Sequence, residues 1–222
     1  MVRYIDEYRQ ELEKHSDNKG SSVRFLLTGK WQTGKKLLVS IVKEPLLGIS
    51  ERYKKICLNP KIGNQWKQLM VEQGLINEVS IATSKGRLKL LELTDKGREK
   101  LKDFGFEVST SFRHGGIEHL YWLKQVKKKL VDAGYDVEEE SPIGNGEAVD
   151  LVIVGKGKKI AVEIETGKSD AVHNIRKCLK AGFDGVVSVA TNKDALKRIK
   201  SGLDQFQRDE IEKVRVRGVW RL

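Results

Sequence analysis

Three acidic residues interrupt two otherwise apolar segments in the second half of the chain. The segment AVDLVIV (148–154) carries Asp150, and KKIAVEIE (158–165) carries Glu163 and Glu165. Both segments have the composition of β-strands. An unpaired buried charge is costly, so carboxylates inside strands that should build a core indicate a chemical role.

A short basic turn joins the two segments and decides which of their residues face one another. If the hairpin centres on 156–157, Val154 faces Lys159 and Asp150 faces Glu163. Facing residues have Cβ atoms about 4.5–5.5 Å apart, and like charges placed that way are destabilising. Burial raises the pKa of at least one such carboxyl group. We therefore expect Asp150 and Glu163 to bind Mg²⁺ or Mn²⁺, because carboxylates and water are the ligands that Mg²⁺ prefers.

The alternative is that this face is solvated and its acids are ordinary surface groups. Val152, Val154 and Ala161 share the face in the expected register, and their apolar side chains argue against solvation. The register is decisive, because a slip of one residue would move Asp150 to the other face.

The elements that must position these acids alternate between helix and strand. Helical periodicity with terminal glycines predicts the helices, and short apolar or alternating runs predict the strands. The expected order is a helix at 116–134, strands at 135–141, 148–154 and 158–165, a helix at 170–182, a strand at 185–191, a helix at 193–203 and an edge strand at 213–222. This order predicts an α/β domain over 115–222 with an αβββαβ core and a mixed sheet, in which the strand at 185–191 is buried.

The first half of the chain predicts a smaller α+β domain. A charged helix is expected at 1–21, then helices at 34–44, 50–58 and 61–74, a hairpin around 84–87 and a last helix from 95. Ser50 is the expected N-cap of the second of these three helices, Gly74 ends the third, and Thr94 or Asp95 caps the last. Three helices followed by a hairpin is the order of a winged helix-turn-helix, here over 22–105, and a linker follows at 106–114.

A winged helix-turn-helix usually places its third helix in the major groove and its hairpin on the flanking backbone. Amide side chains can read base edges, and lysines can contact phosphates. The residues expected to face DNA are Lys61, Asn64, Gln65, Lys67 and Gln68 on the third helix, with Lys85, Arg87 and Lys89 on the hairpin. The alternative is a winged helix used for protein contacts or dimerisation.

The composition favours an anionic partner. The 222 residues carry a formal net charge of +11, which suits nucleic acid and, less often, an anionic membrane surface. The two cysteines, Cys57 and Cys178, are far apart and form no metal-binding motif, which favours a reducing compartment. No segment is apolar enough to span a membrane and the amino terminus has no signal-peptide pattern, so we expect a cytoplasmic protein without membrane contact.

The second domain resembles the PD-(D/E)xK nuclease superfamily, the fold of many restriction enzymes and of archaeal Holliday-junction resolvases. That family has a helix bearing Glu, then Asp on a strand, then Glu-x-Lys on the next strand. GGIEHLYW offers Glu118, EAVDLVIV offers Asp150 and VEIE offers Glu163. The segments ETGKSD and NIRKCLKAGFD, and the winged-helix region, are also similar to nuclease-type domains of archaeal plasmid proteins or DNA-translocating ATPases. The resemblance implies metal-dependent DNA cleavage, with Glu118 as a further metal ligand.

Glu165 departs from the family pattern, because it stands where the family has its lysine. An acid there would act as general base or bind a second metal ion. The expected substitute cation is Lys168, and Lys177 is a weaker candidate. His119 is expected to pack on its helix, and His173 is a candidate DNA contact.

Two other functions stay open at this point. The missing strand lysine would suit an inactive nuclease fold that binds DNA as a regulator. The chain would also suit a partner of a DNA-translocating ATPase that provides the nuclease and winged helix in trans. Cleavage of both strands of a duplex commonly takes two sites, so a homodimer is an expected assembly.

Overall fold

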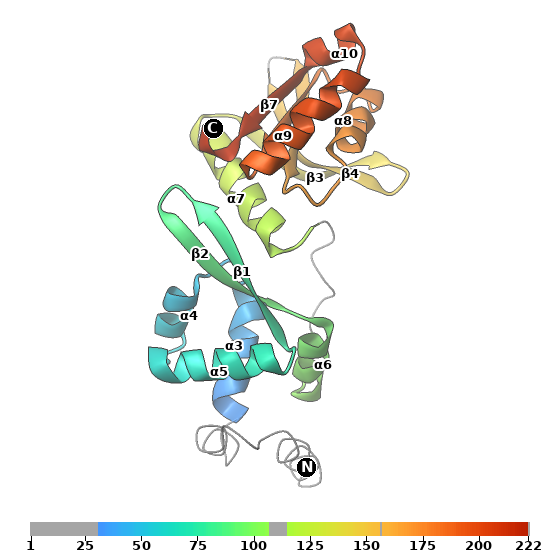
Figure 1. The fold of residues 1–222 in the computed structure, drawn as a ribbon. Coiled ribbons are helices and arrows are strands. Elements are labelled where there is room, and N and C mark those ends of the chain that lie inside the picture. Colours follow the sequence, from blue (N-terminus) through green and yellow to red (C-terminus); the bar gives the residue numbers. More distant parts are fainter. Residues whose placement is uncertain (1–30, 107–114, 156, 222) are drawn as a thin grey trace. The chain divides into compact units, whose positions relative to one another are not determined.

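The computed structural model describes residues 31–106, 115–155 and 157–221, and the chain divides into two compact units between Thr110 and Ser111 (Figure 1). The helix expected at 1–21, residues 22–30 and all but the first residue of the expected linker lie outside the described residues.

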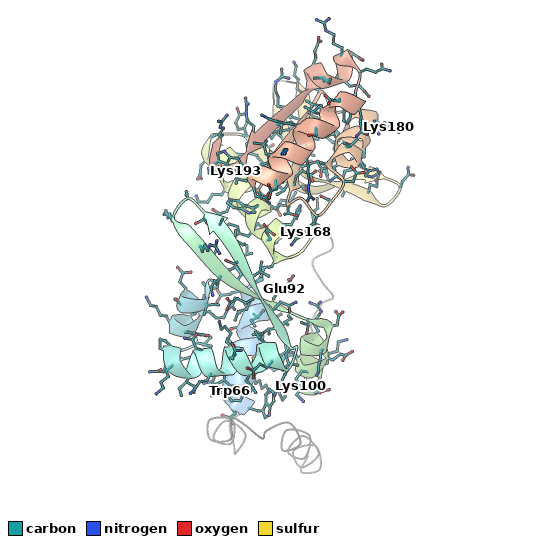
Figure 2. The ribbon with its side chains drawn as sticks, in the orientation of Figure 1. Trp66, Glu92, Lys100, Lys168, Lys180 and Lys193 are labelled. Atoms are coloured by element: carbon teal, nitrogen blue, oxygen red, sulfur yellow. The ribbon has the colours of Figure 1, made fainter. Side chains whose placement is uncertain are left out.

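The first unit consists of helices followed by a β-hairpin. Its elements are α3 (Trp31–Lys43), α4 (Ile49–Lys55), α5 (Pro60–Glu72), β1 (Ile76–Thr83), β2 (Gly86–Leu93) and α6 (Asp95–Asp103). One core joins all of them, with Leu37, Leu38, Trp66, Met70 and Leu91 each at most 2% exposed (Figure 2 labels Trp66). The predicted order of helices and hairpin is confirmed.

The predicted caps are correct at α5 and α6, whereas α3 begins three residues before the predicted start at 34. Gly74, with a φ of +67°, follows α5, and the Thr94 hydroxyl accepts a hydrogen bond from the Gly97 amide at the start of α6. Ser50 was the wrong N-cap for α4, because the helix begins earlier and Gly48 takes that position without a side-chain cap.

A buried arginine joins α3 to α4. Arg52 is fully buried and donates hydrogen bonds to the carbonyl oxygens of Ser40, Glu44, Pro45 and Leu47. These carbonyls lie at the end of α3 and in the turn after it. Those of Ser40 and Glu44 also accept hydrogen bonds from the Glu44 and Leu47 amides, whereas Arg52 supplies the donor for those of Pro45 and Leu47. Burial lowers the pKa of Arg52 to about 10, which leaves it charged at neutral pH.

The second unit has a mixed five-stranded sheet with interleaved helices. Its elements are α7 (Ile117–Asp132), β3 (Asp136–Gly144), β4 (Glu147–Gly155), β5 (Lys158–Glu165), α8 (Ala171–Lys180), β6 (Gly185–Ala190), α9 (Lys193–Gly202), the 3-10 turn η1 (Leu203–Gln205), α10 (Arg208–Lys213), β7 (Val214–Gly218) and η2 (Val219–Arg221). The strand order is β3-β4-β5-β6-β7, antiparallel from β3 to β5 and parallel from β5 to β7. The mixed sheet, the edge position of β7 and the buried position of β6 were predicted; the short helix α10 was not.

Helices cover both faces of this sheet. The buried residues Ile175 and Cys178 of α8 and Ala195 of α9 pack with Ala161 and Val186, so α8 and α9 share one face (Figure 1). The helix α7 contacts β3, β4 and β5. Side chains alternate along β5, so Glu163 and Glu165 lie on the α8 face together with Ala161.

No helix in the described part of the chain is long and apolar enough to cross a membrane.

Candidate functional site

The β4–β5 hairpin has the register that brings two carboxylates together. Leu151 pairs with Val162 and Val154 with Lys159, as predicted. At the next position the Asp150 side chain turns to the backbone, and its Oδ2 accepts a hydrogen bond from the Ile164 amide at 2.7 Å. Asp150 and Glu163 therefore lie beside each other on adjacent strands.

Glu163 is a buried acid with a strongly perturbed pKa. It is 2% exposed, and its Oε1 accepts a hydrogen bond from the Cys178 thiol at 3.2 Å. Burial, and second the charge of Asp150, raise its pKa to about 8 against the opposing effect of Lys177. The direction of this shift is the one expected for a buried carboxyl group beside a second carboxylate.

Lys177 of α8 is the cation at this carboxylate pair. Its Nζ lies 3.2 Å from Glu163 Oε1 and donates a hydrogen bond to the Ala148 carbonyl oxygen at 2.8 Å. The side chain is 13% exposed. A mostly buried ammonium with two fixed partners is held in place far better than a lysine on a loop.

Lys168, the lysine favoured from the sequence, contacts a different acid. Its Nζ lies 3.3 Å from Glu118 Oε2, and 73% of its side chain is exposed (labelled in Figure 2). Lys168 does not reach Glu163 because it lies on the loop after β5. Lys177 reaches it because α8 packs over the face of the sheet that carries Glu163. Lys177, and not Lys168, therefore contacts Glu163, and the role of Lys168 as the substitute cation stays a prediction.

Glu165 is held by neutral donors. It is 1% exposed; Oε2 accepts a hydrogen bond from the Ser169 hydroxyl at 2.8 Å and Oε1 one from the Asn174 amide at 3.0 Å. Each carboxylate oxygen has two lone pairs, so acceptor capacity remains for a water molecule or a ligand.

Two histidines also contact acids. His119 Nε2 lies 3.0 Å from Asp150 Oδ2, with both side chains mostly buried, so His119 belongs to the site rather than only to the packing of its helix. His173 is exposed, and its Nε2 lies 2.8 Å from Glu147 Oε1. Nothing in the sequence pairs His119 with Asp150, since 31 residues separate them.

A buried hydroxyl without a partner borders the carboxylates. Ser188 pairs with Glu163 in the parallel β5–β6 register, so both side chains lie on the same face. Its Oγ is buried and has no hydrogen-bond partner among the described residues. Buried hydroxyls normally have one, and an ordered water or ion supplies it where the protein does not.

These donors fit a magnesium-like ion better than a metal held wholly by protein. Within the described ranges, no three His, Cys, Asp or Glu side chains lie close enough together to hold one metal ion. Glu118 therefore does not form a three-ligand site with Asp150 and Glu163. Mg²⁺ usually needs only one or two carboxylates and completes its shell with water and substrate phosphate. Asp150 Oδ1 and Glu163 Oε2 accept no hydrogen bond from the described residues and remain available. The role of Glu118 as a ligand stays a prediction.

The residues expected to face DNA in the first unit are mostly exposed. Lys61, Asn64 and Gln68 on α5 and Lys85, Arg87 and Lys89 on the hairpin are exposed, and Gln65 is half-buried.

Lys67 is the exception, because its ammonium pairs with Glu78 and 18% of the side chain is exposed. Glu78 also binds Lys89 at 2.6 Å. The hydrogen bonds from Lys67 and Lys89 lower the pKa of Glu78. The outward orientation expected for Lys67 was therefore wrong, because the hairpin folds an acid against that side of α5.

No family model, no curated protein and no solved structure matches the chain.

Proposed function

We propose that the protein is a metal-dependent nuclease that hydrolyses phosphodiester bonds in DNA. The observation that supports this most is the pair Asp150 and Glu163 on adjacent strands, in which Glu163 is buried and its carboxylate contacts the ammonium of Lys177. Such a pair destabilises the fold unless a cation compensates it, which is the arrangement expected of a site kept for chemistry.

In the proposed site, Asp150 Oδ1 and Glu163 Oε2 would hold Mg²⁺ or Mn²⁺. When bound, such an ion polarises a phosphate and lowers the pKa of a bound water. His119 and the Ile164 amide both contact Asp150 Oδ2, so they fix the carboxylate with its other oxygen free.

Lys177 takes the role that the family pattern gives to a strand lysine. Its ammonium lies next to the carboxylate that would hold the ion, so it can stabilise negative charge that develops on the phosphate. Glu165, fixed by Ser169 and Asn174, orients or deprotonates the attacking water.

The architecture supports the same proposal. A helix, an antiparallel strand pair that carries the acids and a parallel crossover through α8 follow the order of a restriction-endonuclease-like domain. The helices and hairpin of the first unit would act as a winged helix-turn-helix, with the exposed residues of α5 and the β1–β2 turn on DNA.

One observation favours an inactive DNA-binding protein as the second candidate. Lys177 and the Cys178 thiol already contact Glu163, so part of the charge is compensated without a metal ion. A decayed site that kept its acids would need such partners.

The test uses full-length protein with labelled linear duplex, single-stranded and four-way-junction DNA, with Mg²⁺ or Mn²⁺. We expect cleavage that is lost in the Asp150→Ala, Glu163→Ala double variant. Lys177→Met should lower the rate by about 10²–10³-fold, the loss typical of one electrostatic stabiliser. Lys180→Met is the matched control, because Lys180 lies on the same helix and is exposed (Figure 2), and its rate should stay near wild type. Binding without cleavage on every substrate would refute the nuclease and favour the inactive DNA-binding protein.

A further inference from the structure

Two adjoining depressions lie near the carboxyl end of β5, and Glu165 lines the first of them. The first is a cavity of about 210 Å³ between the loop after β5, the start of α8 and α9. Its polar lining includes Glu165, Ser169, Asp170 and Arg198, and Val172 forms part of its apolar wall. In open α/β sheets ligands bind outside the carboxyl ends of the parallel strands, which is where this cavity lies.

The second depression has a volume of about 380 Å³ and continues from the first, since both are lined by Val172 and Arg198. Its other lining residues include Lys197, Ser201 and Gln205. Arg198 lines both depressions; the first adds the carboxylates of Glu165 and Asp170, and the second adds the ammonium of Lys197.

This charge pattern is complementary to a nucleotide. Carboxylates accept hydrogen bonds from the exocyclic amino groups of bases. Lysine and arginine bind phosphate. The first cavity is smaller than the roughly 300–1,000 Å³ that hold drug-sized ligands, so it suits one ring system.

We propose that the two depressions together bind one nucleotide, with a base that carries an exocyclic amino group in the first and its phosphate in the second. Glu165 retains lone pairs beyond those used by Ser169 and Asn174. Arg198 Nη1 donates to the Gly167 carbonyl oxygen at 2.7 Å, which fixes the guanidinium at the boundary between the two depressions. Thymine places a carbonyl oxygen where cytosine and adenine have the amino group, so the carboxylates repel it.

This inference rests on the proposed function, because it assumes that the bound nucleotide is part of the DNA strand that the nuclease cleaves. Glu165 belongs both to the proposed catalytic site and to the first cavity. The bound nucleotide is then a near neighbour of the phosphate that is cleaved, and its base is unstacked. This geometry favours a single-stranded or locally opened substrate, because a base inside a duplex does not reach a pocket.

The test measures binding without cleavage. Full-length protein in EDTA is titrated with labelled homopolymers of dC, dA or dT, about twelve nucleotides long, and binding is followed by fluorescence anisotropy. We expect dC and dA to bind at least about fivefold more tightly than dT. Arg198→Ala should weaken the binding of all three homopolymers, because it removes a phosphate contact, and Lys200→Ala should change the binding little. Lys200 is the matched control because it is exposed on the same helix and lines neither depression.

A second variant, Glu165→Gln, keeps the shape of the side chain and replaces an acceptor by a donor. It should weaken dC and dA binding relative to dT. Competition by the mononucleotides dCMP and dAMP shows whether the site binds a free nucleotide or a nucleotide within a DNA strand. Strong competition by the mononucleotides identifies a free nucleotide as the ligand, and competition by oligonucleotides alone identifies a DNA strand.

Equal binding of the three homopolymers, or a preference that survives Glu165→Gln, would overturn the inference. Metal-dependent cleavage by the same preparation would then still support the proposed nuclease. A preference that depends on Glu165 in a protein that cleaves nothing would support the nucleotide site and refute the nuclease.

Discussion

Replacement of Glu163 by glutamine should change how the stability of the protein depends on pH. Glutamine has the same shape as glutamate but no charge to bury. The pKa of Glu163 is raised from 4.5 to about 8, first by burial and second by Asp150. The folded state therefore favours the protonated carboxyl group, and the unfolded chain ionises it at lower pH.

The sign and size of the effect follow from this difference. For a carboxyl group with a raised folded pKa, the stabilising contribution is full below pH 4.5 and is lost as the pH rises to about 8. Each pKa unit corresponds to about 1.36 kcal/mol, so the loss over this interval is about 5 kcal/mol. Glu163→Gln lacks the titrating group, so its free energy of unfolding should increase relative to wild type by up to about that amount between pH 4.5 and 8.

The assay is urea-induced unfolding in EDTA at several pH values between about 4.5 and 8.5, followed by far-UV circular dichroism. The test is how the difference in free energy of unfolding between Glu163→Gln and wild type changes with pH. Any effect of the substitution that does not depend on pH shifts all values equally and does not affect this change. Glu212→Gln is the matched control, because its carboxylate is exposed, and it should differ from wild type by less than about 0.5 kcal/mol throughout. A difference between Glu163→Gln and wild type that stays flat with pH would refute the buried, charge-repelled state of Glu163.

Three further substitutions test the first unit by urea unfolding. Arg52→Met should lower the free energy of unfolding by about 3 kcal/mol or more, because it leaves the half-buried carbonyl oxygens of Pro45 and Leu47 without this donor and removes a charged donor from those of Ser40 and Glu44; a loss below about 1 kcal/mol would contradict that role. Thr94→Ala should cost about 1 kcal/mol by removing the cap of α6, and an unchanged midpoint would show that the cap contributes nothing. The pKa of Glu78 is lowered by Lys67 and Lys89, so its stabilisation is present above the unfolded value of 4.5 and is lost as pH falls below it. Glu78→Gln should therefore be less stable than wild type at pH 7, and this difference should shrink in acid; a difference that persists in acid would exclude the ion pairs as its cause.

Local patterns were sufficient to predict most of the elements. Alternation along 158–165 assigned Glu163 and Glu165 to one face, and the turn predicted the register that pairs Val154 with Lys159. Both inferences depend only on residues close in sequence. The helix α10 has six residues and was missed, because so short a helix shows little periodicity.

Contacts between distant elements could not be predicted in the same way. Lys177 reaches Glu163 only because α8 crosses the sheet with one particular rotation, and His119 reaches Asp150 from α7 for the same kind of reason. Lys67 looked exposed on a helical wheel, yet the hairpin places Glu78 against it. Helical and strand periods identify the face that a residue occupies, but not its partner on another element.

Lys177 also changes how the departure at residue 165 should be understood. In the family pattern that the sequence resembles, a strand lysine supplies the positive charge two residues after the acid. Here the strand supplies a second acid, Glu165, whose partners Ser169 and Asn174 are neutral, while the next helix supplies the ammonium at Glu163. The proposed site therefore keeps its cation and gains a carboxylate. That extra acceptor, free of any cationic partner among the described residues, is what allows Glu165 to act on a water molecule and on the amino group of a neighbouring base in the same proposed active site.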